Sequence, residues 1–125
     1  MKKILVVEDD LVNQMILIDF LAANGYETVA ASSGPDGIER FDRDVPDLCL
    51  VDVQLPRKNG FEVCFEVKRS PEGRELPVLL MSAVYTDREH ADRYASGSLR
   101  ADGYLTKPFD LADLLRRVRT LLHDA

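Results

Sequence analysis

The chain has 125 residues, of which 46% are apolar and 30% are charged, which suffices for the core of one domain but not of two. Its formal net charge of −6 and sequence pI of about 4.9 disfavour nonspecific binding to nucleic acids and anionic lipids. No apolar run approaches the roughly 20 residues that cross a bilayer and no secretory leader is evident, so we expect a cytoplasmic protein with no membrane contact and no direct nucleic-acid contact.

Five short apolar runs alternate with segments of helical periodicity, a pattern typical of a parallel sheet covered by helices on both faces. The runs are rich in leucine and β-branched residues and lack polar alternation, as expected for strands buried on both sides. The predicted strands are Lys3–Val7, Glu27–Ala31, Leu48–Asp52, Val78–Ser82 and Gly103–Thr106.

The segments between these strands predict the helices. The first helix ends at Asn24-Gly25, because glycine accepts the left-handed conformation that follows a helix, and the last begins after Asp110 as N-cap. Three further helices are predicted over Ser33–Asp42, Gly60–Arg69 and Asp87–Ser96. We expect the first helix to pack on the sheet through Val12, Met15, Ile16, Phe20 and Ala23.

This arrangement indicates the α/β class, with a (βα)5 doubly wound parallel five-stranded sheet in the flavodoxin-like order 2-1-3-4-5. That order makes the first and third strands neighbours at the switch point, where ligands bind beyond the carboxyl ends of the strands. No repeat or linker interrupts the pattern, so we expect residues 1–125 to form one domain. Cys49 and Cys64 lack metal-like spacing and are predicted to be reduced core residues.

Acidic residues follow both strands at the predicted switch point. Glu8, Asp9 and Asp10 follow the first strand, and Asp52 ends the third. Like charges held together destabilise a fold unless a cation is present, and oxygen ligands of this kind suit Mg²⁺ or Mn²⁺. Each residue alone has a simpler explanation as a helix or turn cap, but together they favour a metal or phosphate site.

A hydroxyl and an ammonium group occupy the ends of two further strands, at Ser82 and Lys107. Alone, each is adequately explained by a backbone hydrogen bond or a surface salt bridge. With the carboxylates and a metal, they suit phosphoryl transfer to a carboxylate. In that chemistry Asp52 is the nucleophile, Glu8 and Asp9 hold the ion, and Lys107 neutralises charge on the transferred group.

Four motifs carry a more specific indication. They are Val-Val-Glu-Asp-Asp, Leu-Val-Asp-Val-Gln-Leu-Pro with a later Asn-Gly, Leu-Met-Ser-Ala, and Gly-Tyr-Leu-Thr-Lys-Pro-Phe. Their order and spacing resemble the receiver domains of two-component response regulators over essentially the whole chain. The resemblance implies that Asp52 accepts a phosphoryl group from the phosphohistidine of a sensor histidine kinase or phosphotransfer protein.

The resemblance also implies that Mg²⁺ is held by Glu8, Asp9, Asp52 and the main-chain carbonyl of Gln54. Glu8 stands where the family more commonly has aspartate, and its extra methylene predicts a contact with the metal through water.

Further implied features concern signalling. Ser82 and Tyr104 match the family's switch pair, although Tyr104 also has the simpler role of packing at a strand edge. The Lys107-Pro108 bond matches a cis peptide. Phosphorylation would then alter the face formed by the fourth helix, fifth strand and fifth helix, which would contact a downstream effector protein or output domain. A longer link at Gly97–Arg100 changes the shape expected for that face.

Two other classes of protein remain open at this point. A small phosphatase of the haloacid dehalogenase superfamily uses similar groups but needs an acid two residues after the nucleophile, where this chain has Gln54, which is not an acid. A phosphate-independent pseudo-receiver typically lacks the acceptor or the acidic pair, and both are present here. We therefore predict a phosphorylation-dependent signalling protein and not an enzyme.

Overall fold

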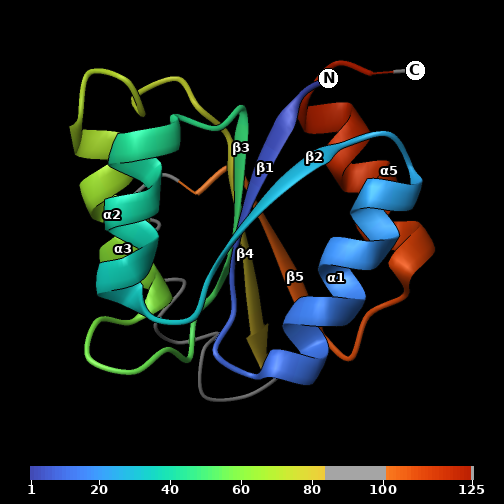
Figure 1. The fold of residues 1–125 in the computed structure, drawn as a ribbon, viewed down its shortest axis with the longest axis horizontal. Coiled ribbons are helices and arrows are strands. Elements are labelled where there is room, and N and C mark those ends of the chain that lie inside the picture. Colours follow the sequence, from blue (N-terminus) through green and yellow to red (C-terminus); the bar gives the residue numbers. More distant parts are fainter. Residues whose placement is uncertain (84–100, 125) are drawn as a thin grey trace.

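The computed structural model describes residues 1–83 and 101–124. Among these residues, five parallel strands form one sheet in the order β2-β1-β3-β4-β5, which confirms the predicted topology and puts β1 beside β3 (Figure 1). The strands are β1 Lys3–Val7, β2 Glu27–Ala31, β3 Leu48–Asp52, β4 Val78–Ala83 and β5 Gly103–Lys107.

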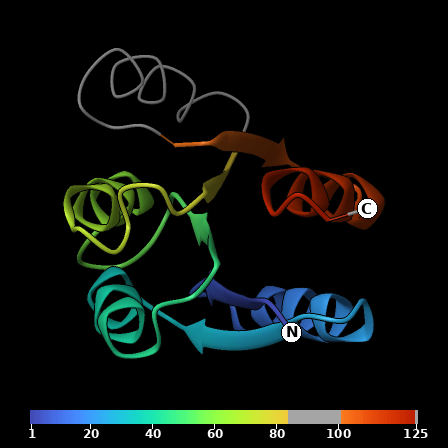
Figure 2. The ribbon, with the colours of Figure 1, turned by 90° about the horizontal axis from the view of Figure 1, so that it is seen from above.

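Helices cover both faces of the sheet. The described helices are α1 Leu11–Ala23, α2 Gly34–Asp44, α3 Gly60–Arg69 and α5 Leu111–Leu121. Helices α1 and α5 lie on one face, and α2 and α3 lie on the other (Figure 2). None of these four is long and apolar enough to span a membrane. The predicted helix Asp87–Ser96 and the link Gly97–Arg100 lie outside the described residues.

The central strands β1, β3 and β4 are largely apolar because successive side chains enter different cores, whereas the edge strands β2 and β5 are only partly buried. In β1, Leu5 and Val7 belong to the core beneath α2 and α3, whereas Ile4 and Val6 belong to the core beneath α1 and α5. The two cores therefore hold the sheet from both sides and leave its carboxyl-end edge for polar residues.

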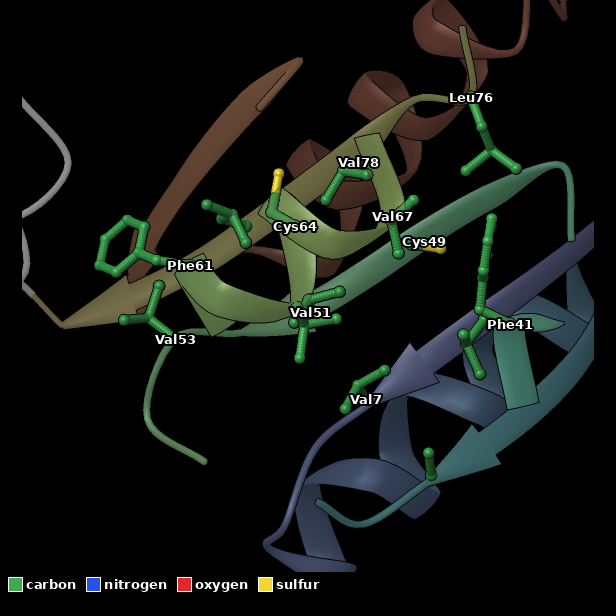
Figure 3. Packing of buried hydrophobic residues seen from close by; sticks show 14 residues of the cluster. Val7, Phe41, Cys49, Val51, Val53, Phe61, Cys64, Val67, Leu76 and Val78 are labelled. Atoms are coloured by element: carbon green, nitrogen blue, oxygen red, sulfur yellow. The ribbon is translucent and has the colours of Figure 1, made fainter. Parts of the chain in front are cut away.

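The core beneath α2 and α3 contains both cysteines (Figure 3). Phe41 of α2 and Phe61 of α3 are its largest fully buried members. Cys49 and Cys64 are buried free thiols, and burial raises the pKa of each, to about 12 for Cys64. The prediction of reduced, core-filling cysteines is confirmed.

The prediction of which face of α1 meets the sheet was largely wrong. Leu17 and Leu21 are its buried residues, and Phe20 is partly buried against the same core. The other members of the predicted stripe are exposed: Val12, Met15, Ile16 and Ala23. Because α1 has apolar residues around more than one side, more than one stripe satisfies helical periodicity.

Several predicted boundaries move by one or two residues. Strand β4 extends to Ala83 and β5 to Lys107, because these two residues continue the pairing of the strands. Helix α2 begins at Gly34 because Ser33 serves as its N-cap, accepting a hydrogen bond from the backbone N–H of Asp36.

Asp10 is the N-cap of α1, and its side chain accepts hydrogen bonds from the N–H groups of Val12 and Asn13. We expect Asp10→Ala to lower the free energy of unfolding by about 1 kcal/mol, because these donors lose their partner. Asp10→Asn keeps the acceptor oxygen while removing the charge, and should therefore be close to wild type in urea unfolding without metal. Equal destabilisation by both substitutions would show that the charge, and not the cap, matters.

Candidate functional site

The predicted site residues gather at the carboxyl-end edge of the sheet. Glu8 follows β1 and is 1% exposed, Asp52 ends β3 and is 5% exposed, and Asp9 is exposed. One carboxylate oxygen from each of these three residues lies within 4.8 Å of the other two. The adjacency of β1 and β3 therefore brings the predicted acidic cluster together.

Lys107 joins this cluster from a more distant strand. Its Nζ donates to Asp52 Oδ2 at 2.9 Å and to Glu8 Oε1 at 3.4 Å. Strand β4 lies between β5 and β3, so the lysine side chain crosses the end of β4 to reach both carboxylates. The Lys107-Pro108 peptide bond is cis, as the resemblance implied.

The remaining carboxylate oxygens are held by the backbone. The N–H of Gln54 donates to Asp52 Oδ1 at 3.1 Å, and the N–H of Asp10 donates to Glu8 Oε2 at 3.2 Å. Each buried carboxylate therefore has one oxygen bound to a nearby N–H and the other bound to Lys107. This pattern fixes the orientation of both carboxylates.

Burial and charge shift the pKa values of this site. Burial, and after it the hydrogen bond and negative charge of Asp52, raise the pKa of Glu8 to about 7. Burial alone would lower the pKa of Lys107, but the hydrogen bonds and charges of Asp52 and Glu8 outweigh it, so that its pKa lies above the ordinary value. Lys107 is therefore held in its charged form, whereas ionisation of all the carboxyl groups of the site at once is unfavourable.

The donor set fits a hard divalent cation. The cluster has three carboxylates, and the one ammonium group beside it contacts two of them, Glu8 and Asp52. Closely spaced carboxylate oxygens are the ligands that Mg²⁺ prefers. The backbone of Gln54 turns back onto Asp52, next to this cluster. That its carbonyl is a ligand stays a prediction.

Ser82 and Tyr104 lie on the strands beside the cluster. Ser82 is 7% exposed and pairs with Thr106 across β4 and β5, one residue beyond Met81, which pairs with Asp52. Tyr104 is half-buried and packs against the core beneath α2 and α3. Both positions suit the predicted switch pair, whose function stays a prediction.

Beside the cluster, Asp10 caps α1, so the simpler explanation offered for this residue is confirmed. Gln14, which was not singled out, donates from its side-chain amide to the main-chain carbonyls of Glu8 and Ala31. No sequence signal distinguishes Gln14 from any other polar residue in the first turns of a helix.

An apolar hollow of about 470 Å³ lies next to the site, between α1 and the segment that joins β5 to α5. Glu8 and Lys107 form part of its wall, together with Ile16, Phe109 and Leu111. Helix α1 exposes four large apolar side chains, of which Ile16 lines this hollow: Leu11, Val12, Met15 and Ile16.

This fold and site define a class of α/β protein with a carboxylate and lysine centre at the switch point of a parallel sheet. A family model described as the response regulator receiver domain matches residues 4–119. The chain therefore belongs to the response regulator receiver domain family, whose members are signalling domains of two-component systems.

Curated relatives agree with this assignment. The chain is 39% identical over 120 residues to Response regulator MprA of Mycobacterium leprae, covering 96% of this chain and 50% of the relative. It is 36% identical over 121 residues to Probable transcriptional regulator ycf27 of Cyanophora paradoxa, covering 97% of this chain and 48% of the relative. The chain thus spans about half the length of these relatives.

Solved structures show the same fold over nearly the whole chain. A putative response regulator from Chloroflexus aurantiacus superposes with a TM-score of 0.87 at 30% identity, covering 98% of each chain. The receiver domain of a sensor histidine kinase from Pseudomonas aeruginosa superposes with a TM-score of 0.88 at 28% identity, again covering 98% of each chain. That structure has a magnesium ion coordinated in its active-site cleft.

Proposed function

We propose that this receiver domain accepts a phosphoryl group on Asp52, with Mg²⁺, from the phosphohistidine of a sensor histidine kinase or phosphotransfer protein. The observation that carries the proposal is the buried Asp52 carboxylate, held between Lys107 and the Gln54 N–H and clustered with Glu8 and Asp9. In the reaction, a carboxylate oxygen of Asp52 bonds to phosphorus while the phosphorus–nitrogen bond breaks, and the histidine nitrogen leaves with the electron pair and takes up a proton.

The residues of the chain prepare this step in distinct ways. Lys107 neutralises charge at Asp52, and the Gln54 N–H holds the carboxylate in one orientation. Glu8, Asp9 and Asp52 would hold Mg²⁺, together with the carbonyl of Gln54. The ion would stabilise negative charge on the transferred phosphoryl oxygens.

We propose that phosphorylation draws Ser82 and Lys107 toward the phosphoryl oxygens, with Tyr104 repositioned in turn. The added negative charge and strong acceptor oxygens supply the driving force. Ser82, Tyr104 and Lys107 lie on adjacent strands, and β5 runs directly toward α5. The change would be transmitted to the face that includes β5 and α5, which would contact an effector protein or output domain.

The surface beside the site supports a protein as the phosphoryl donor. The apolar hollow opens next to Glu8 and Lys107, and α1, whose Ile16 lines the hollow, exposes further large apolar side chains. Apolar surface of this kind marks protein interaction sites.

We propose that residues 1–125 act in the cytoplasm as one receiver domain. The domain would be a signalling switch and not an enzyme, with no direct contact to nucleic acid or membrane.

The test is intact mass spectrometry after incubation with acetyl phosphate or phosphoramidate, with and without Mg²⁺. We expect the wild type to gain the mass of one phosphoryl group only with Mg²⁺, and Asp52→Asn to gain nothing. Asp42→Asn, at an exposed aspartate of α2, should behave as the wild type. A wild type that never gains mass would favour a phosphate-independent interaction module instead.

A further inference from the structure

We infer that Gln14 is a positioning residue for the acidic pair Glu8 and Asp9. The inference rests on the proposed metal-dependent function, because it assigns Gln14 a part in preparing the metal ligands. It is carried by the contacts that the Gln14 side chain makes across two strand ends.

The side-chain amide of Gln14 connects α1 to the ends of β1 and β2. Its Nε2 lies 3.0 Å from the carbonyl oxygen of Glu8, 3.1 Å from that of Ala31 and 3.2 Å from Ser32 Oγ. Carbonyl oxygens only accept hydrogen bonds, so the nitrogen of the amide, and not its oxygen, must face them. The N–H of Glu8 also donates to the Ala31 carbonyl at 3.0 Å, which ties the two strand ends together.

The contact with the Glu8 carbonyl bears directly on Asp9. This carbonyl and the N–H of Asp9 belong to one planar peptide unit, so a bond that holds the carbonyl also fixes the plane from which Asp9 continues. Glu8 is the first residue after β1, and its N–H is held by the Ala31 carbonyl. Gln14 supplies the restraint on the carbonyl side of Glu8, at the point where the two acidic side chains diverge.

The acidic cluster needs this restraint because its members repel one another. One carboxylate oxygen from each of Glu8, Asp9 and Asp52 lies within 4.8 Å of the other two, and like charges at such distances repel. Without the Gln14 bonds, rotation of the peptide between Glu8 and Asp9 would let the carboxylates separate. Residues that orient metal ligands through hydrogen bonds typically change metal affinity by 10- to 100-fold when they are replaced.

The experiment compares two side-chain amides, one near the start of α1 and one at its C-cap. Gln14→Met keeps the length of the side chain and removes its donor. The control is Asn24→Leu, because Asn24 Nδ2 donates to the Phe20 carbonyl at 2.8 Å near the other end of α1. Two quantities are measured by NMR: the Mg²⁺ dissociation constant by titration, and the hydrogen exchange rate of the Glu8 amide in metal-free protein.

We expect Gln14→Met to weaken Mg²⁺ binding by about 10-fold and to speed exchange of the Glu8 amide. Asn24→Leu should leave both quantities within about twofold of wild type, as expected for a site remote from the metal. The phosphorylation rate of Gln14→Met with acetyl phosphate should recover at saturating Mg²⁺, because Asp52 and Lys107 are intact. Equal Mg²⁺ affinity in the two variants, or a wild type that binds no Mg²⁺, would overturn the inference.

A second variant, Gln14→Glu, tests the inference if Gln14→Met does not fold. It keeps the shape of the side chain, lacks the N–H donor at neutral pH, and adds a negative charge near the cluster. An effect of charge alone would tighten Mg²⁺ binding, whereas loss of positioning weakens it. Tighter binding by this variant would therefore overturn the inference. A wild type that binds Mg²⁺ but gains no phosphoryl group would contradict the proposed function while the positioning by Gln14 still stands.

Discussion

Metal-free protein is expected to lose stability as the pH rises from 5 to 8, through Glu8. The pKa of this carboxyl is about 7 in the folded protein, against an ordinary value of 4.5. Between these values the folded state keeps a proton that the unfolded state has released, so raising the pH favours unfolding. The contribution of Glu8 is complete below about pH 4.5 and lost above about pH 7, a change of about 3 kcal/mol.

Urea unfolding in EDTA at several pH values measures this effect. Glu8→Gln cannot ionise and should flatten the decline, whereas Glu39→Gln, at an exposed position of α2, should retain it. Mg²⁺ should stabilise the wild type more at pH 8 than at pH 5, because a cation binds the ionised carboxyl. The same slope in Glu8→Gln and the wild type would contradict the assignment of this pKa to Glu8.

Replacing Lys107 by methionine is expected to have the second large effect on stability. Methionine retains much of the apolar stem but removes the ammonium group that contacts Asp52 and Glu8. Those carboxylates are almost completely buried, and removing one partner of a buried ion pair costs roughly 3 to 5 kcal/mol. We expect a loss of about 3 kcal/mol at pH 8 in EDTA, and a smaller loss at pH 5, where Glu8 takes up a proton.

A matched control is available in β1. Lys3 Nζ lies 3.6 Å from Glu27 Oε2, in a pair whose glutamate side chain is 53% exposed. Such exposed pairs contribute at most about 1 kcal/mol, so Lys3→Met should change urea unfolding little. Similar losses from Lys3→Met and Lys107→Met would show that the burial of the Lys107 partners has no special effect.

The fold was predictable because its strands and their order depend on simple patterns. Apolar runs without polar alternation predicted strands buried on both faces, and the alternation with helices predicted the parallel order that the sheet has. Which side of α1 is buried could not be predicted in the same way. Both the exposed Val12, Met15 and Ile16 and the buried Leu17 and Leu21 are apolar, so only the packing against the sheet distinguishes them.

For the site, the sequence by itself determined which groups stand at the strand ends, because the sheet order and the positions of Glu8, Asp9, Asp52 and Lys107 follow from local patterns. The tertiary structure alone decided how these groups meet. The side chain of Lys107 crosses the end of β4 to reach the carboxylates of Asp52 and Glu8. The side-chain amide of Gln14 connects the ends of β1 and β2. Such contacts depend on distances between residues far apart in the chain, and periodicity and motif order do not contain those distances.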